Sequence, residues 1–356
     1  MDTLRFHHAD RERGPSVGVI AEIGVNHDGS IETAERLIDA AKTAGADAVK
    51  FQYFDPATLL SGDGTLASYQ RGKADSARQM LERLRLGPDE LVAAREYTRG
   101  LGLDFVVTPF SVRDVATLAA TEVDAVKIAS PDAVNPWLLE AAAGLGKPMW
   151  VSTGTCGLAE LTFAAELLGG HTAGGGLLHC VSAYPTPVEQ AGLGGIGAMR
   201  EWLHEGLTGE SAARLAVGYS DHTRSTEAGG WAVLAGACVL EKHLTHDRAA
   251  SGPDHAASLE PAEFASYVAN AKRAVAALGP VDKRCTEAER DVRAVSRQSL
   301  AYTRDLPAGH VLRRTDLETR RPGTGVPAAQ GPAWVGRTLA RPVTQGTLAD
   351  EGDAVN

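Results

Sequence analysis

The sequence predicts an eight-stranded β/α (TIM) barrel followed by a small β-rich domain, and three observations support this fold class. From about residue 17 to 245, a short β-branched apolar run, a turn and a helical pattern recur eight times, the number that closes a barrel. Polar side chains follow nearly every apolar run, as expected where a barrel carries an active site. After residue 298 the chain changes to short strand-like pieces rich in Gly, Pro, Arg and Thr.

Helical stretches separate the strand-like runs. The runs are 17–23, 46–51, 104–108, 123–129, 148–152, 176–181, 215–219 and 238–244. Helical spacing is clearest at Ile31–Ala44, where Ser30 is expected to cap the start and Gly45 to end the helix, and at Pro88–Gly100. A doubly wound open sheet is the competing architecture. No G-x-G-x-x-G follows the first run, which disfavours its dinucleotide-binding version.

The chain is expected to have four parts. Residues 1–16 are charged and His-rich and are predicted to form a disordered extension, followed by the barrel over 17–280. A polar linker over 281–297 then leads to the small domain, residues 298–356. Within that domain, segments 304–317 and 341–355 resemble each other, each with a Gly-centred turn before apolar residues, which suggests pseudo-twofold symmetry.

Composition excludes several classes of protein. The 356 residues are 44% hydrophobic, enough for a sizeable core, and the net charge of −10 argues against nucleic acid as a partner. The four cysteines include no C-x-x-C pair, so neither structural zinc nor a disulfide framework is expected. Neither a secretory signal nor a membrane-length apolar run is found in the sequence, which favours a cytoplasmic protein.

Two lysines interrupt apolar strand-like runs, Lys50 in ADAVKFQ and Lys127 in VDAVKIAS. A buried lysine is costly unless an anion pairs with it. On alternate strands, both would face one lumen and could bind a phosphate and a carboxylate together. Two alternatives remain: each lysine pairs with a buried Asp or Glu as core structure, or one forms a Schiff base, which the histidines disfavour because they indicate metal chemistry.

The last two strand-like runs end in histidines. Period-two alternation places Glu241 and His243 on one face of their strand and Lys242 on the other, and His222 closes the preceding strand. Two imidazoles and a carboxylate at one rim suit Mn²⁺, Fe²⁺, Co²⁺ or Zn²⁺. The alternative for either histidine is a hydrogen-bonded core residue, which is how His179 is interpreted.

Other strand ends add polar groups to the same rim. The Ser152-Thr153-Gly154 turn and Ser130 can cup phosphate oxygens with backbone N–H groups and hydroxyls. The remaining strand-end residues are Glu22 with Asn26 and His27, Gln52, Thr108, Ser182, Tyr184, Ser220 and Asp221.

Ten short motifs in order carry a resemblance to the N-acetylneuraminate (sialic acid) synthase family. They are AEIGVNHDG (21–29), GADAVKFQ (45–52), TPF (108–110), VKIAS (126–130), STG (152–154), LLHCVSAYPTP (177–187), YSDHT (219–223), EKHLT (241–245), GPDHAASLEP (252–261) and RPGTG (321–325). The last lies in the small domain, which resembles the family's antifreeze-like (SAF, β-clip) domain. The resemblance covers nearly the whole chain.

The resemblance implies an enzyme that condenses phosphoenolpyruvate with N-acetylmannosamine or a related open-chain sugar, with Mn²⁺ or Mg²⁺ and with Co²⁺ as a further candidate. It also implies a domain-swapped homodimer. His222 and His243 would bind the metal beside Glu241, and Glu22 would handle a proton or orient water. The sugar would contact Gln52, Tyr184, Asp254 and, from the partner subunit, Arg321. Phosphoenolpyruvate would be held by Lys50, Thr108, Lys127, Ser130, Ser152 and Ser220.

The sequence departs from the family pattern mostly near the acceptor, which leaves the sugar open. Ser182 stands at a phosphoenolpyruvate contact where many members have Asn, and Pro131-Asp132 replaces a usual Gly-acid pair. The closest rival is an octulosonic or heptulosonic acid synthase, which would need an extra cationic cluster for a phosphorylated aldose. A metal-dependent pyruvate aldolase and a catalytically silent sugar-phosphate-binding protein are further alternatives.

Overall fold

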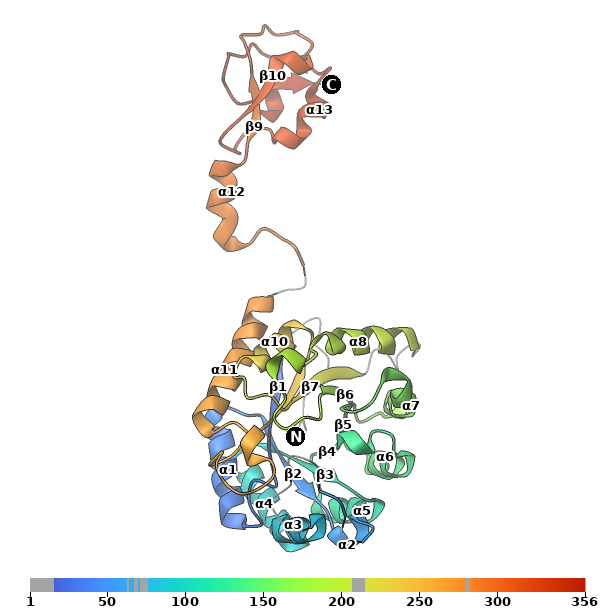
Figure 1. Cartoon of the computed structure of the whole chain (residues 1–356). Coiled ribbons are helices and arrows are strands. Elements are labelled where there is room, and N and C mark those ends of the chain that lie inside the picture. The colour runs from blue at the N-terminus through green and yellow to red at the C-terminus, as the bar shows by residue number, and fades with distance from the viewer. Residues whose placement is uncertain are drawn as a thin grey trace. The chain divides into compact units, whose positions relative to one another are not determined.

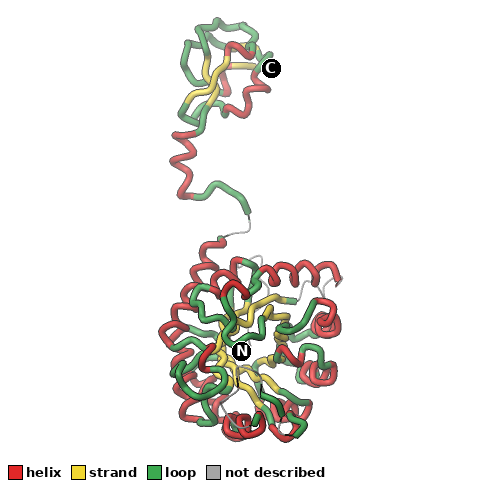
Figure 2. The backbone as a smooth tube through the Cα atoms, in the orientation of Figure 1, coloured by secondary structure: helices red, strands yellow, loops and turns green. Residues whose placement is uncertain are grey.

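A computed structural model describes residues 16–62, 64–66, 70, 76–206, 215–279 and 282–355. Nearly all of the predicted N-terminal extension therefore lies outside the described residues. The chain divides into two compact units, Met1–Pro280 and Val281–Asn356. Figures 1 and 2 show both units. No helix in the described ranges has the length and apolar character needed to cross a membrane.

The first unit is a closed barrel of eight parallel strands in the order β1 to β8, with β8 pairing back to β1. The predicted barrel is thus confirmed, and an open doubly wound sheet is excluded. Strand β7 runs two residues further than predicted, to Asp221. The strands are β1 Gly18–Gly24, β2 Ala48–Tyr53, β3 Asp104–Pro109, β4 Ala125–Ile128, β5 Met149–Ser152, β6 Gly175–Cys180, β7 Ala216–Asp221 and β8 Val239–His243.

Helices surround the barrel on its outside, as Figures 1 and 2 show. They are α1 Ile31–Ala44, α2 Pro56–Leu59, α3 Ala77–Leu84, α4 Pro88–Gly100, α5 Val112–Thr121, α6 Pro136–Ala143, α7 Thr162–Gly170, α8 Gly194–Gly206, α10 Ala228–Leu234 and α11 Pro261–Leu278. Helix α1 has the predicted ends. The Ser30 side chain accepts from Thr33 N, and Gly45 ends the helix in the left-handed region, at φ 84°.

Two apolar layers fix where a site can form. A large layer packs between the strands and the surrounding helices. A second cluster fills the barrel interior with one side chain from each strand: Ile20, Ala48, Val106, Ala125, Trp150, Leu178, Ala216 and Val239. All of them except Leu178 lie in the amino-terminal half of their strands. Apolar side chains therefore fill the amino-terminal part of the lumen, and its polar groups lie at the carboxyl ends of the strands.

The second unit is small and β-rich, as predicted. It comprises α12 Arg290–Ser296, β9 Ser299–Tyr302, β10 Leu317–Arg320, α13 Gly331–Trp334, β11 Thr338–Leu339 and β12 Ala354–Val355. Strands β9 and β10 form one antiparallel pair, and β11 and β12 form another. Helix α12 occupies part of the segment that was predicted as a linker. The core includes Trp334 and Tyr302, both fully buried.

The sequence echo in this unit corresponds to repeated geometry. Arg304 Nε donates to Asp316 Oδ1 at 3.0 Å, and Arg341 Nε donates to Asp353 Oδ1 at 2.6 Å. In each repeat the arginine precedes the aspartate by twelve residues, and a glycine with positive φ lies between them, Gly309 or Gly346. Each half of the domain thus contains one such arginine–aspartate contact, which we call an Arg–Asp anchor.

Candidate active site

A cavity of about 230 Å³ lies at the carboxyl ends of the strands and gathers most of the residues predicted from the sequence. The predicted residues that line it are Glu22, Lys50, Gln52, Thr108, Lys127, Ser130, Ser152, Tyr184, Ser220, His222, Glu241, His243 and Asp254. They come from all parts of the barrel. Closure of the sheet is therefore what brings them together.

Both pocket lysines are buried and paired with carboxylates. Lys50 Nζ lies 2.7 Å from Glu22 Oε2 and donates to Thr108 Oγ1 at 3.1 Å. Lys127 Nζ lies 3.1 Å from Glu241 Oε1, and Lys50 Nζ lies 4.0 Å from that same oxygen. The alternative in which each lysine pairs with a buried acid therefore describes both, but the pairs line a cavity instead of filling a core.

In this cluster the cost of burying each charge is set against its attraction to the opposite charges nearby. Burial opposes ionisation of Glu241, but Lys127 and Lys50 outweigh it and lower the pKa of Glu241 to about 2. Burial also works against the charge on Lys50, yet Glu22 and Glu241 leave the pKa of Lys50 raised. For Lys127 burial prevails over Glu241, and its pKa is lowered. Burial raises the pKa of Glu22 in spite of Lys50, which suits that carboxyl to exchange a proton.

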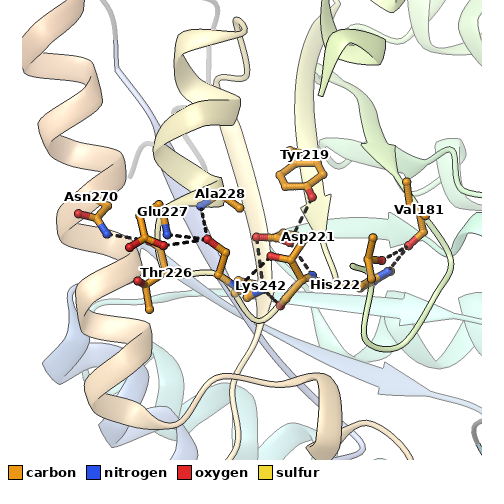
Figure 3. Close-up of polar contacts among 12 residues, drawn as sticks. Val181, Tyr219, Asp221, His222, Thr226, Glu227, Ala228, Lys242 and Asn270 are labelled. Atoms are coloured by element: carbon orange, nitrogen blue, oxygen red, sulfur yellow. Dashed lines mark hydrogen bonds and ion pairs between the residues drawn. The ribbon is translucent and has the colours of Figure 1, made fainter. Parts of the chain in front are cut away.

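His222 and His243 face each other at the ends of β7 and β8, with ring centroids 5.4 Å apart. Nδ1 of His222 lies 2.8 Å from the Val181 carbonyl oxygen, as Figure 3 shows. Because that oxygen only accepts, Nδ1 carries a proton. In the neutral form of the ring, the lone pair is therefore on Nε2. The Tyr184 ring packs against both, with centroids 4.0 Å from His222 and 5.9 Å from His243.

The donor set fits a divalent metal with open coordination positions. Burial lowers the pKa of His243 well below its ordinary value, with His222 and Lys50 adding to the effect, so this ring is neutral and able to ligate. Asp254 lies 3.6 Å from His243 Nδ1, and burial raises its pKa to about 6. The described residues contain no group of three or more His, Cys, Asp or Glu placed to hold a metal. Water or substrate would have to complete the coordination of a two-histidine site.

Apart from Glu22 Oε2, which pairs with Lys50, two buried polar atoms in the cavity have no hydrogen-bond partner within the described part of the chain. They are Ser152 Oγ and Glu241 Oε2. Such atoms cost free energy when they remain unsatisfied, and they point to a polar ligand. Nearby, Gly154 N donates to Ser130 Oγ at 3.0 Å, which orients that hydroxyl.

One wall of the cavity is apolar, and sequence reasoning missed it. It consists of Val25, Phe54, Leu59, Met80, Leu81, Leu84 and Phe110. Most of these residues belong to the connection between β2 and α4, which contains α2 and α3. The available signal was the length of that connection, together with the apolar spacing of the MLERL segment at 80–84.

Two predicted site residues are not among those that line the cavity. Ser182 is absent from the cavity lining; it is exposed, and a Cβ built on Gly154 would lie 2.2 Å from its hydroxyl. Arg321 is exposed on the second unit. His179, interpreted as structural, has Nε2 2.9 Å from the Ala191 carbonyl oxygen and stacks on Tyr219. All four cysteines are free.

Comparisons with known proteins agree with this arrangement. Residues 37–283 match the NeuB family, and residues 297–353 match the SAF domain. The chain is 34% identical over 357 residues to an N,N'-diacetyllegionaminic acid synthase of Legionella pneumophila, covering 98% of both chains. It is 33% identical to the protein of the same name from Campylobacter jejuni, over 94% of this chain and 98% of the other.

Among solved structures, the chain is similar to an N-acetylneuraminic acid (sialic acid) synthetase from Leptospira borgpetersenii in complex with citrate. The sequence identity is 32% and the TM-score 0.67, over 78% of this chain and 90% of the other. Both units therefore match known proteins, and the matches include the barrel that carries the cavity.

Proposed function

This chain belongs to the NeuB family, and we propose that it condenses phosphoenolpyruvate with an open-chain amino sugar aldehyde to give a nonulosonic acid and phosphate. The observation that carries the proposal is the convergence of two lysines and two facing histidines in one cavity. The lysines suit an anionic substrate and the histidines a metal. A binding protein for a sugar phosphate alone would have no need of the second group.

Phosphoenolpyruvate binds in the lysine half of the cavity. Lys50 and Lys127 offset the charge of its phosphate and carboxylate, and hydroxyls complete the contacts. Ser152 Oγ, without a partner among the described residues, is free to donate to a phosphate oxygen. The other hydroxyls are Thr108, Ser130 and Ser220.

His222 and His243 hold a divalent metal, Mn²⁺ or Mg²⁺, with Co²⁺ as a further candidate. Imidazole ligands favour Mn²⁺ over Mg²⁺, which prefers oxygen. When bound, the metal supplies Lewis acidity that polarises the sugar aldehyde. Tyr184 packs against both rings and restricts their rotation.

The reaction needs three proton movements. C3 of phosphoenolpyruvate bonds to the aldehyde carbon, and the aldehyde oxygen gains a proton. Water then adds to the cation-like C2 and loses a proton. The C2 hydroxyl of the tetrahedral intermediate passes its proton to the departing phosphate as the C2–O bond to that phosphate breaks. Glu22, held at 2.7 Å by Lys50 and at 2.8 Å by Gln52 Nε2, exchanges one of these protons. Glu241 keeps Lys127 in place throughout.

The apolar wall indicates the class of acceptor. Methyl groups of acetamido substituents or of a deoxy carbon would gain by burial against Phe54, Met80 and Leu81, whereas a phosphate would lose hydration there. The acceptor is accordingly a non-phosphorylated acetamido sugar, with 2,4-diacetamido sugars favoured over N-acetylmannosamine. The two relatives described above, both named N,N'-diacetyllegionaminic acid synthase, support this choice.

The enzyme works as a domain-swapped homodimer in which Arg321 of the second unit reaches the sugar of the partner's barrel. Its exposed guanidinium is available for such a contact. This element of the proposal rests on the family resemblance.

Phosphate release tests the function. The purified protein with phosphoenolpyruvate and Mn²⁺ should release phosphate only when a suitable aldose is added, and fastest with a 2,4-diacetamido sugar. Preference for a phosphorylated aldose would instead identify an octulosonic or heptulosonic acid synthase. Turnover of pyruvate without phosphate release would identify an aldolase. No release with any aldose would refute the proposal.

A further inference from the structure

Asp221 and Lys242 form an ion pair on the outer face of the barrel, behind the active-site cavity. The two residues are register partners on β7 and β8, and Lys242 Nζ lies 3.3 Å from Asp221 Oδ2. Both side chains are completely buried. Figure 3 shows them facing each other between the strands and the outer helices. Neither residue lines the cavity.

Further contacts hold the pair and the turn beside it. Asp221 Oδ1 accepts from Thr223 N at 2.8 Å and from Tyr219 Oη at 3.2 Å. Lys242 Nζ donates to the Thr223 carbonyl and lies 5.5 Å from the centroid of the Tyr267 ring on α11. Both the N–H and the carbonyl of Thr223 are thereby tied to the ion pair. These contacts hold the backbone directly after His222 from the outer side of the barrel.

The position of the pair relates it to the two candidate metal ligands. His222 directly follows Asp221, and His243 directly follows Lys242. On β8, alternation points Lys242 outwards and His243 into the cavity. His222 is also held on its inner side, because its carbonyl accepts from Thr186 N at 2.9 Å and its Nδ1 meets Val181 O. The ion pair therefore cross-links the two strands one residue before both imidazoles.

Stability alone does not account for a buried ion pair at this place. The layer between barrel and helices is largely apolar, and each buried charge loses several kcal/mol of hydration on the order of magnitude usual for proteins. Replacing such a pair by apolar side chains of similar volume is often neutral or stabilising. A polar cross-link that is costly yet present suggests a role in precise geometry.

We propose that Asp221 and Lys242 are positioning residues that fix the separation and orientation of His222 and His243 for a divalent metal. The proposal rests on the metal site of the proposed function. Partners behind metal ligands set the orientation of the ligating rings in the same way.

The double variant Asp221→Leu with Lys242→Met tests it, because the apolar pair leaves no unpaired buried charge. Mn²⁺ is titrated into the metal-free full-length protein, and binding is followed by calorimetry. The dissociation constant for Mn²⁺ should rise about 10- to 100-fold, the effect usual for partners behind metal ligands. The midpoint of thermal unfolding should fall modestly, because Thr223 N and Tyr219 Oη lose their acceptor. A purely structural role would give that fall without the loss of Mn²⁺ affinity.

Two further variants serve as a control and as a milder test of the same contact. Arg99→Met removes the ion pair of Arg99 with Asp124, 2.6 Å apart, on another part of the barrel; it should lower stability and leave Mn²⁺ affinity unchanged. If the double variant does not fold, Tyr219→Phe removes only the contact to Asp221 Oδ1 and should still weaken Mn²⁺ binding several-fold.

The outcomes separate this proposal from the one it depends on. Mn²⁺ affinity in the folded double variant equal to that of the parent would overturn the positioning role and leave the metal site standing. For Tyr219→Phe, unchanged affinity would have the same meaning where the double variant cannot be studied. A parent protein that binds no Mn²⁺ would overturn both.

Discussion

Lys127 Nζ donates to Glu241 Oε1 at 3.1 Å, across the barrel from β4 to β8, and Ser220 Oγ donates to the same oxygen at 3.0 Å. Glu241 belongs to the strand that ends in His243. Glu241 thus contacts the lysines proposed to bind phosphoenolpyruvate and belongs to the strand that carries one of the histidines proposed to bind metal. Changes in either half can be measured separately through the two substrates.

Lys127→Met should weaken phosphoenolpyruvate binding. The change removes one of two pocket cations and leaves Glu241 with less compensation, so the cavity becomes more negative. A charge-assisted hydrogen bond contributes roughly 1.5–3 kcal/mol, which predicts a rise in KM for phosphoenolpyruvate of about 10- to 150-fold. Steady-state phosphate release measures it. Lys42→Met, on the exposed surface of α1, is the control, and an unchanged KM for Lys127→Met would remove the lysine from the phosphoenolpyruvate site.

His222→Ala and His243→Ala should each abolish turnover while the fold persists. Each variant removes one of two imidazoles that face each other in the cavity, and the described residues offer no third ligand to replace it. A chelator should likewise stop phosphate release by the parent, and added Mn²⁺ should restore it. Circular dichroism checks the fold. Full activity in either variant would rule out the metal assignment.

Leu81→Asn tests the apolar wall. Leu81 lines the cavity from α3, and a polar amide there would remove apolar contact with acetamido methyl groups. Contacts of this kind are worth about 1–3 kcal/mol, so KM for the acceptor should rise about 10-fold or more, with KM for phosphoenolpyruvate nearly unchanged. Leu234→Asn, at an exposed leucine of α10, is the matched control. Equal effects on both substrates would indicate a general disturbance of the cavity.

The sequence was informative where a residue's role depends on local periodicity. Alternation along β8 places Glu241 and His243 in the cavity and Lys242 outside, as found. The ends of the strands could be read in the same way, because in a parallel barrel they all meet at one rim.

Contacts between distant segments could not be read from the sequence. Lys127 and Glu241 are 114 positions apart, and only closure of the barrel shows which acid pairs with which lysine. The apolar wall was missed because it depends on how the connection between β2 and α4 folds over the rim. The partners of Lys242 were missed for a similar reason, since Tyr267 approaches it from α11.

Asp316→Asn should destabilise the second unit. Asp316 is buried and accepts hydrogen bonds from Arg304, from Arg313 N and from His310 Nε2, the last at 2.8 Å. Burial disfavours the charge of its carboxyl, but these donors outweigh burial and lower the pKa of Asp316 to about 2. A carboxyl whose pKa falls on folding contributes stability above its unfolded value of about 4, and this contribution is lost as the pH falls from about 4 to about 2. The unfolding midpoint of this unit in the parent should drop across that range. In Asp316→Asn the midpoint should be lower already at pH 7 and should depend less on pH. The unfolding free energy of the unit should fall by about 1–3 kcal/mol.

Asp353→Asn, at the equivalent anchor of the repeat, should behave similarly at pH 7, whereas Asp291→Asn, exposed on α12, should have no effect. Calorimetry of the full chain resolves these changes, and equal midpoints for Asp316→Asn and the parent at pH 7 would show that the repeated Arg–Asp anchors do not stabilise the unit.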